Sequence, residues 1–548
     1  MLEPAESYEA MMRDFVWRIP ERYNIAYEVC DRWALREPER TCLHYFEPDG
    51  RHRSMRYGTL ARRSSAFARS LAAKGITKGD RVALLLPQSF ETVVAHVAIY
   101  RLGAIAVPLA LLFGPDALDY RLLVSGARAV VTNAMGLEKL AEIADRRAAL
   151  SCCVSIDGAD RHAFGFETMC DADDTLLEPV ATTAATPALM IFTSGTTGAP
   201  KGALHGHGVL AGHMPGIQYT HAFLPQPGDR MWTPADWAWA GGLLNALLPA
   251  LALGVPVVAS KAQKFDAETA CRILAEMEVR NAFLPPTALR LLATVEAPRE
   301  RFAIDLRTLS SAGEPLGTET ATWAERALGV PVNELYGQTE CNAVIGSCAQ
   351  NGAARRGSTG LPLPGHRVAL LDADGTPVGP GMRGEIAIAG PDPVMFLGYW
   401  RDAAATEAKF CGDWMLTGDH AIADTEGYIT FIGREDDIIT SSGFRIGPAE
   451  IENCLEGHRA VALAAVVGKP DPVRTEIVKA YVVLRPGEAG TPALAADLSA
   501  HVRAKLSAHE YPREIAFVES LPMTTTGKII RRELRERAAR EIEAADAS

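Results

Sequence analysis

Hydroxyl and glycine residues gather in front of a lysine at residues 193–202, which read TSGTTGAPKG. Glycine lets backbone N–H groups approach an anion closely, so that they can form an anion-binding nest. The hydroxyl groups add further donors, and Lys201 adds a positive charge. An ordinary turn has a similar composition, but so many hydroxyl groups at a fixed distance from a lysine favour a phosphate-binding loop.

This segment differs from the Walker A loop. That motif needs Gly-Lys-Ser/Thr at the start of a helix, whereas here Pro200 precedes Lys201 and Gly202 follows it. A P-loop kinase or GTPase is therefore disfavoured.

Three later segments could complete a nucleotide site. Residues 336–340 (YGQTE) combine an aromatic face for a base, a hydroxyl for an oxyanion and a carboxylate for a hard cation. The carboxylate in residues 417–419 (TGD) could accept hydrogen bonds from two ribose hydroxyls, although this tripeptide alone is usually a turn. Residues 521–528 (LPMTTTGK) end on a lysine that could reach a developing negative charge, although alone it would be one more surface lysine.

Together and in this order, these segments resemble the signatures of the adenylate-forming superfamily, which comprises acyl-CoA synthetases, peptide-synthetase adenylation domains and beetle luciferases. The resemblance covers nearly the whole chain, from about residue 8 to residue 534, and is closest to the medium-chain acyl-CoA synthetases. It implies an AMP-forming acid–thiol ligase. Such an enzyme uses ATP and Mg²⁺ to form an acyl-adenylate and then transfers the acyl group to coenzyme A.

The resemblance also implies roles for individual residues. Tyr336 would stack on adenine, Glu340 would hold Mg²⁺, and Asp419 with Arg434 would bind the ribose. The catalytic residues would be Lys528, Lys201, Thr339 and Glu340. The ATP-binding set would be Thr193, Ser194, Gly195, Thr196, Thr197, Gly198, Lys201, Gly313, Glu314, Pro315, Glu334, Tyr336, Gly337, Gln338, Thr339, Asp419, Arg434 and Lys528.

A second group of residues would serve the acyl group and coenzyme A. By resemblance, the hinge lies at Asp436. Coenzyme A would contact Ser442, Gly443, Phe444, Arg474, Tyr511, Pro512 and Arg513. The acyl substrate would meet Trp239, Ala240, Gly241, Ala312, Gly337 and Arg445.

Small residues in the acyl set predict the size of the acid. Positions 240, 241, 312 and 337 tend to be bulkier in the acetate and propionate branch, which has a tryptophan at position 337, and all four are small here. We therefore expect an acid larger than acetate: medium-chain, branched or aromatic. The alternative is that Trp237 or Trp239 refills the space. Trp237 and Ala238 replace the family's usual small pair, so the pocket's shape departs from the family pattern.

The elements that must position these residues have an α/β pattern over the first ~430 residues. Apolar runs predict strands, and residues 88–102 predict a helix. The expected N-terminal strands are residues 81–86, 104–109, 129–132, 189–192, 384–389 and 428–432. After a charged stretch, a smaller α+β unit is expected, with helices at 448–455 and 494–506 and strands at 461–467, 478–484 and 515–518.

The predicted fold is thus α/β: a large N-terminal adenylation domain of α/β layers plus a β-rich section (1–435), and a small mobile C-terminal lid domain (436–548).

Composition limits the other function classes. The net charge of −12 argues against a broad nucleic-acid surface. The ten scattered cysteines are expected to be reduced and mostly packed. Residues 241–259 are apolar but contain Asn245 and two prolines, which favours a buried segment over a membrane span. With no signal peptide visible at the N-terminus, we expect a cytoplasmic enzyme.

Three alternatives stay open. An acyl-AMP ligase could load a separate carrier protein, since only 20 residues follow Lys528 and no fused carrier is expected. A luciferase-like oxygenase has no residue in its favour. A catalytically dead regulator would lack Lys528, Glu340 or Lys201, and all three are present. The resemblance also suggests a lysine acetyltransferase acting on Lys528, and the chain could form a homo-oligomer.

Overall fold

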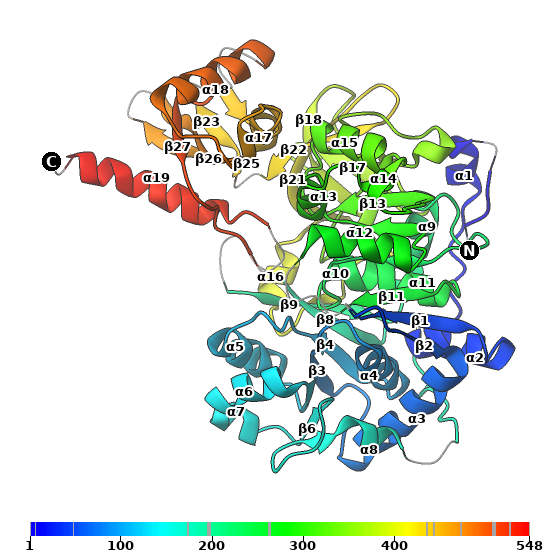
Figure 1. Ribbon diagram of the computed structural model, residues 1–548. Helices are drawn as coiled ribbons and strands as arrows, with labels where there is room; N and C mark the ends of the chain where they lie inside the picture. Colours follow the sequence, from blue (N-terminus) through cyan, green and yellow to red (C-terminus); the bar gives the residue numbers. More distant parts are fainter. Residues whose placement is uncertain are drawn as a thin grey trace.

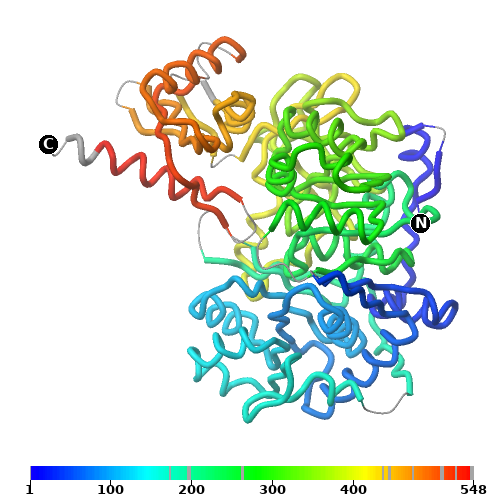
Figure 2. Tube along the Cα trace, viewed as in Figure 1, coloured from blue at the N-terminus to red at the C-terminus, as the bar shows by residue number. Residues whose placement is uncertain are grey.

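The computed structural model describes most of the chain, and Figure 2 traces its path, with the two termini on opposite sides of the molecule. The described residues are 2–5, 7–47, 49–171, 175–193, 199–260, 265–434, 437–441, 444–471, 474–506, 511–524 and 528–546.

An eight-stranded sheet, built largely from parallel strands, occupies the lower part of the molecule in Figure 1. Its central strands are buried along their whole length, because helices cover both faces, and they therefore read as continuous apolar runs. In spatial order the strands are β19 (Gly398–Tyr399), β9 (Lys201–Gly206), β8 (Pro187–Thr193), β4 (Ile105–Pro108), β3 (Arg81–Leu85), β5 (Ala129–Thr132), β6 (Cys152–Ser155) and β7 (Phe164–Gly165).

A nine-stranded sheet lies beside it, and its strands β10 to β15 contribute residues to the wall of the central cavity. Its middle strands are parallel: β10 pairs with β11 on one side and with β12 on the other, and β13 and β14 follow β12. In spatial order the strands are β16 (Leu361–Pro362), β15 (Cys341–Gly346), β14 (Val332–Gln338), β13 (Thr308–Ala312), β12 (Asn281–Phe283), β10 (Met231–Trp232), β11 (Val257–Ser260), β1 (Thr41–Phe46) and β2 (His52–Arg56).

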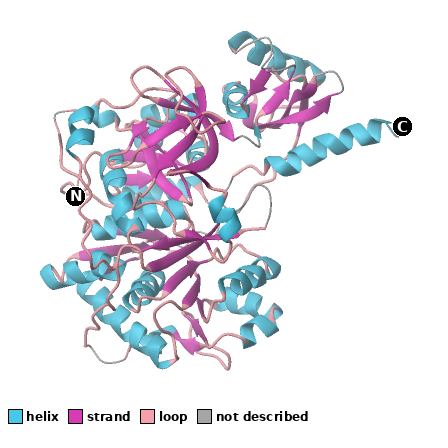
Figure 3. Cartoon of the chain, turned by 180° about the vertical axis from the view of Figure 1, so that it is seen from behind, coloured by secondary structure: helices cyan, strands magenta, loops and turns pink. Residues whose placement is uncertain are grey.

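Helices pack around these two sheets, as the helices in Figure 3 show from behind. Their bounds are α1 (Tyr8–Asp14), η1 (Tyr27–Asp31), α2 (Arg32–Arg36), α3 (Tyr57–Ala73), α4 (Phe90–Arg101), α5 (Pro115–Ser125), α6 (Ala134–Glu142), α7 (Ala144–Ala148), α8 (Phe166–Cys170), α9 (Val209–Thr220), α10 (Ala240–Gly242), η2 (Leu243–Leu247), α11 (Leu248–Ala252), α12 (Ala267–Glu276), α13 (Pro286–Leu292), α14 (Pro298–Arg301), α15 (Thr318–Leu328), η3 (Ala349–Asn351) and α16 (Ala403–Glu407).

The remaining two sheets are mainly antiparallel. The first is the β-rich section: β17 (Val368–Leu371), β18 (Arg383–Ala389), β20 (Phe410–Cys411), β21 (Trp414–Ala423) and β22 (Ile429–Arg434). The second belongs to the C-terminal part, at the upper left in Figure 1: β23 (Ile439–Ser441), β24 (Phe444–Ile446), β25 (Val461–Asp471), β26 (Thr475–Leu484) and β27 (Glu514–Phe517), with α17 (Pro448–Glu456), α18 (Pro492–Lys505) and α19 (Arg531–Asp546).

The sequence-based fold class is confirmed: a large α/β part with a β-rich section is followed by a small α+β part. The predicted strands and helices are present, most within two residues of their expected ends. The main difference is β25, which continues to Asp471 instead of ending near residue 467. Its pairing with β26 continues to Asp471, at the end of the hairpin. The predicted strand was too short because the prediction followed apolar side chains, whereas strand pairing is made by backbone hydrogen bonds.

The apolar run at residues 241–259 is a buried segment, as expected, and forms α10, η2, α11 and part of β11. Within the described ranges, no helix is long and apolar enough to cross a bilayer. The ten cysteines are free thiols, and eight of them are buried.

Candidate active site

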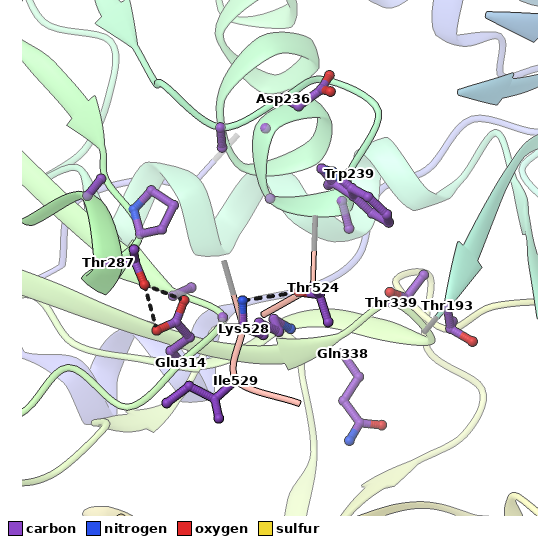
Figure 4. A pocket seen from close by; sticks show the side chains of 18 of the residues that line it. Thr193, Asp236, Trp239, Thr287, Glu314, Gln338, Thr339, Thr524, Lys528 and Ile529 are labelled. Atoms are coloured by element: carbon purple, nitrogen blue, oxygen red, sulfur yellow. Dashed lines mark hydrogen bonds between the residues drawn. The ribbon is translucent and has the colours of Figure 1, made fainter. Parts of the chain in front are cut away.

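A cavity of about 1800 Å³ opens between the sheets and the C-terminal part of the chain. Figure 4 shows part of its lining, with Lys528, Glu314, Thr339 and Trp239 among the labelled side chains. It brings together the predicted residues Thr193, Lys201, Trp239, Ala240, Gly241, Ala312, Gly313, Glu314, Pro315, Glu334, Tyr336, Gly337, Gln338, Thr339, Glu340, Asp419, Arg434 and Lys528.

Other predicted residues are not placed at this cavity. Arg474, Tyr511, Pro512 and Arg513 are described but do not line it. Phe444 and Arg445 belong to β24, of which the structure describes only the backbone at these two positions. The predicted residues outside the described ranges are Ser194, Gly195, Thr196, Thr197, Gly198, Asp436, Ser442 and Gly443.

The predicted phosphate segment joins two strands. Thr193 ends β8 and Lys201 begins β9, and the two residues are cross-strand partners in an antiparallel pair. A strand therefore follows the segment where a Walker A loop would enter a helix, in agreement with the sequence. The ammonium of Lys201 lies 5.2 Å from the ring centre of Tyr399.

Two local irregularities turn Asp419 into the cavity. Residues 417–419 lie opposite the single residue Ile386, which makes a bulge in β21, and Gly418 has a φ of +75° there. Asp419 is also the cross-strand partner of Arg434 on β22, and the guanidinium Nε lies 3.6 Å from its carboxylate. The Thr-Gly-Asp sequence is thus a strand bulge rather than a turn.

Hydrogen bonds hold the Asp419 carboxylate from the adjoining sheet. Tyr336 Oη and Gln338 Nε2 both donate to Asp419 Oδ2 over 2.6 Å, and Gln338 Nε2 also donates to the Thr417 carbonyl. The other oxygen, Oδ1, faces Arg434. Tyr336 and Asp419, predicted for the base and the ribose, are therefore directly linked.

Glu340 occupies the turn between β14 and β15 and is 7% exposed. Its Oε1 accepts a 2.5 Å hydrogen bond from Tyr399 Oη, a partner that no sequence motif indicated. Burial and the neighbouring carboxylate raise the pKa of Tyr399, so its hydroxyl stays protonated and donates. In the described part of the chain, no three His, Cys, Asp or Glu side chains form a metal-binding group.

Lys528 extends from the C-terminal part into this cavity. Its Cε lies 3.8 Å from the point where a Cβ on Gly313 would stand, and its backbone N–H donates to Thr524 Oγ1 (Figure 4). The side chain of Lys528 is exposed to solvent, and it lines the cavity. Removal from bulk water lowers the pKa of Lys528, while Glu314, Asp419 and Glu340 partly oppose that shift. The positive charge of Lys528, from the small part of the chain, thus interacts electrostatically with carboxylates of the large part.

A further ion-pair network links the two parts and was not visible in the sequence. Glu314 accepts hydrogen bonds from Thr287 Oγ1 (Figure 4) and from Arg290 Nη1. Arg290 Nε in turn lies 3.3 Å from Glu456 on α17. Burial raises the pKa of Glu456 to about 7. Because Arg290 belongs to no recognised motif, only the three-dimensional arrangement shows that it bridges both sides.

The part of the cavity that is predicted to hold the acyl group, called the acyl part below, contains the predicted small residues. Trp239 lines it and packs edge-on against Phe113, with ring centres 5.7 Å apart. Trp237 is instead buried in the core, 1% exposed, and is not among the described lining residues. Of the two tryptophans that could have refilled the space, only Trp239 is therefore placed to do so.

The two predicted pocket glycines differ in their surroundings. A Cβ on Gly241 would meet the Phe283 ring at 3.1 Å, so this glycine leaves room beside an aromatic side chain. A Cβ on Gly337 would meet the backbone nitrogen of Ala343 at 2.3 Å. Gly337 is therefore dictated by backbone packing between β14 and β15, and its small size is not evidence for a wide pocket.

Two partly buried carboxyl groups in the cavity wall have altered acidity. Burial raises the pKa of Glu334 to about 7 and that of Asp236 to about 6. Asp236 accepts a hydrogen bond from the Ala238 backbone N–H through Oδ1. It was absent from the predicted set, and a single aspartate in an aromatic segment gave no signal.

Comparison with known proteins agrees with this geometry. Residues 30–400 match the family model described as AMP-binding enzyme, and residues 450–528 match its C-terminal domain. The chain is 32% identical to the mitochondrial acyl-coenzyme A synthetase ACSM2 of Rattus norvegicus over 94% of this chain and 92% of that protein.

Solved structures show the same similarity. An acyl-CoA synthetase from Brucella canis has 37% identity and a TM-score of 0.75, covering 97% of this chain and 99% of that one. The anthranilate CoA ligase AuaEII, solved with anthranoyl-AMP, has 27% identity and a TM-score of 0.88, covering 96% and 99%. Taken with the cavity, these matches show that the chain belongs to the AMP-binding enzyme family and is an ATP-dependent, AMP-forming acid–CoA ligase.

Proposed function

We propose that this ligase activates a carboxylic acid larger than acetate, and that the described arrangement is the one that forms the adenylate. The observation that carries this proposal is the position of Lys528. It reaches into a cavity that also contains Lys201, Thr339 and the carboxylates of Glu340 and Asp419.

In the first half-reaction, a carboxylate oxygen of the acid attacks the α-phosphorus of ATP. A P–O bond forms, and the bond to pyrophosphate breaks. No general base is needed, because a carboxylic acid is already ionised near neutral pH. The site must instead bring two anions together and stabilise the developing charge. Lys528, Lys201 and the hydroxyl of Thr339 are positioned to do so.

Magnesium would be held by Glu340. Its carboxylate is oriented by Tyr399 and is the kind of hard oxygen ligand that Mg²⁺ prefers. The bound ion would neutralise phosphate charge during transfer.

In the second half-reaction, the thiol of coenzyme A attacks the acyl carbonyl and AMP leaves. We infer that the C-terminal domain, residues 436–548, rotates about Asp436 relative to residues 1–435 and withdraws Lys528. The predicted coenzyme A residues Arg474, Tyr511 and Arg513 lie away from the cavity in the described arrangement, as this proposal requires.

The size of the acid is inferred from the acyl part of the cavity. Ala240, Gly241 and Ala312 are small, and Trp237 packs in the core. The similarity to a ligase named for anthranilate, an aromatic acid, supports a medium-chain, branched or aromatic substrate. A cytoplasmic location, a homo-oligomer and acetylation of Lys528 remain predictions from the sequence.

The experiment is pyrophosphate release with MgATP and a panel of acetate, isobutyrate, hexanoate, octanoate and benzoate, each with and without coenzyme A. We expect turnover that peaks above propionate in size and continues only with coenzyme A, giving a thioester. Turnover confined to acetate would contradict the proposed acid class. Adenylate without thioester would favour the alternative, an acyl-AMP ligase that loads a separate carrier protein.

A further inference from the structure

Two buried asparagines lie next to the predicted acyl-binding glycines. Asn245 is on the π-helix η2, four residues after Gly241, and therefore projects from nearly the same side of the helical segment. Asn342 is on β15, and its Cα lies 2.7 Å from the point where a Cβ on Gly337 would stand. Both asparagines line the cavity.

The two amides form one hydrogen bond with each other. Asn342 Nδ2 donates to Asn245 Oδ1 over 2.9 Å, and the two residues are 9% and 1% exposed. Across the described ranges, neither side chain has a second hydrogen-bond partner. Among the described residues, the pair therefore leaves the amide NH2 of Asn245 and the amide oxygen of Asn342 without a partner, so that donor and acceptor groups stand together at the cavity wall. Exchanging oxygen and nitrogen in both amides swaps which asparagine carries the unused NH2 and which the unused oxygen, but the pair still offers both kinds of group.

The surroundings make this half-satisfied pair unusual. The lining of the same cavity includes apolar or small residues, among them Phe283, Ala312 and Gly241. Buried amide groups are normally fully hydrogen-bonded, because burial without a partner is unfavourable. Nothing in the predicted activation chemistry, which takes place at the carboxylate and the phosphates, uses these two groups.

We propose that the Asn245–Asn342 pair binds a neutral hydrogen-bonding substituent, foremost a hydroxyl, on the acyl group. The preferred acid is then a hydroxylated acid rather than a plain hydrocarbon one. This inference rests on the proposed function, because it concerns the same acyl pocket. A hydroxyl group fits both halves of the pair, since it can accept from the amide N–H and donate to the amide carbonyl.

A charged substituent fits less well. The amide pair carries no charge, and Asp236 adds a carboxyl group to the wall of the same cavity. Neither the amide pair nor Asp236 would therefore supply a counter-charge to a second carboxylate on the substrate.

The test compares matched acids in the pyrophosphate-release assay with the full-length enzyme. Benzoate is compared with 2-, 3- and 4-hydroxybenzoate, and hexanoate with 6-hydroxyhexanoate. We expect at least one hydroxylated acid to exceed its parent at least tenfold in kcat/KM, because a site built for a hydroxyl discriminates strongly against the analogue that lacks it.

The decisive variant is Asn245→Leu, which has similar size and no amide. It should lower the ratio of kcat/KM for the hydroxylated acid over its parent at least tenfold, whatever happens to the overall rate. The smaller Asn245→Ala should do the same if leucine prevents folding. Leu244→Met is the control, since Leu244 is buried in the same helix and is not among the described lining residues. It should leave the ratio unchanged.

Two results would overturn the inference alone: preference for the plain acids by the unmodified enzyme, or an unchanged ratio in a folded Asn245 variant, which would make the pair a structural clamp between η2 and β15. If no acid of either kind released pyrophosphate, the proposed function would fail and this inference with it.

Discussion

At the scale of single residues, the cavity's glycines show why residue type alone is an incomplete guide to pocket size. Gly337→Ala would place a methyl group against the Ala343 backbone nitrogen, which cannot move as a side chain can. We expect it to lower the free energy of unfolding by ~1–3 kcal/mol or more, as overpacking does. Urea denaturation measures this loss.

Gly241→Ala is the matched comparison. Its Cβ would meet only the edge of the Phe283 ring, which needs to shift by a few tenths of an ångström. This variant should fold with near-normal stability and shift acid preference toward shorter acids. A Gly337→Ala protein as stable as Gly241→Ala would contradict the backbone explanation.

Glu334 should make ATP binding depend on pH. Because burial raises its pKa to about 7, the carboxyl is protonated below that pH and ionised above it. If it accepts a hydrogen bond from the adenine amino group, kcat/KM for ATP should rise as pH rises through about 7. Glu334→Gln should flatten that rise. ATP's own titration is common to both enzymes, so two superimposable profiles would show that Glu334 plays no such part.

The predicted nucleotide-site residues that line the cavity could be identified in the sequence because they occur in contiguous motifs, such as residues 336–340. Tyr399, Arg290 and the pair Asn245–Asn342 were not. Each acts as a single side chain whose partner is 24 to 166 residues away, and the largest separation is that of the contact between Arg290 and Glu456. Only folding brings such partners together, so no local pattern could reveal them.

At the scale of elements, continuous apolar runs identified the buried parallel strands. Strand β5, for example, has the bounds that its sequence predicted. The bulge at residues 417–419 was not predictable, because it depends on the register of β21 against β18. That bulge, rather than the Thr-Gly-Asp sequence by itself, places Asp419 beside Arg434.

The bridge from Glu314 through Arg290 to Glu456 should favour the arrangement in which Lys528 occupies the cavity. We expect Arg290→Gln to slow acid-dependent adenylate formation by roughly tenfold, equivalent to about 1.4 kcal/mol. Thioester formation from supplied acyl-adenylate should change less, since Lys528 must leave the cavity for that step. Arg272→Gln, which removes an exposed pair within α12, is the control. Equal slowing of both steps would mean that Arg290 contributes only to general stability.

At the scale of the whole molecule, buried histidines should make the fold sensitive to acid. Burial lowers their pKa to about 3 or 4, below the 6.5 expected when unfolded, so the unfolded chain binds more protons between these values. Stability should therefore fall as pH drops from 7 to 5. The histidines are His96, His205, His207, His213 and His221.

Three partly buried carboxyl groups oppose this trend. The folded state raises the pKa of Glu334, Glu456 and Asp236. At a pH between the unfolded-state and folded-state pKa of each group, the folded protein binds more protons, so acidification stabilises it. Five histidines outnumber them, and the net effect is destabilisation by acid. Thermal unfolding at pH 7, 6 and 5 tests this balance, and a melting temperature that rises on acidification would contradict it.

We propose that both parts of the molecule act together in the first half-reaction. The C-terminal part supplies Lys528 to a cavity in the N-terminal part, where the adenylate forms. The most direct test is acid-dependent exchange of labelled pyrophosphate into ATP without coenzyme A, using the unmodified enzyme, Lys528→Ala, and Lys505→Ala as a control outside the cavity. We predict exchange with acids larger than acetate, reduced roughly 10²-fold or more in Lys528→Ala and retained in Lys505→Ala. Exchange that needs no acid, or that persists undiminished in Lys528→Ala, would contradict the claim.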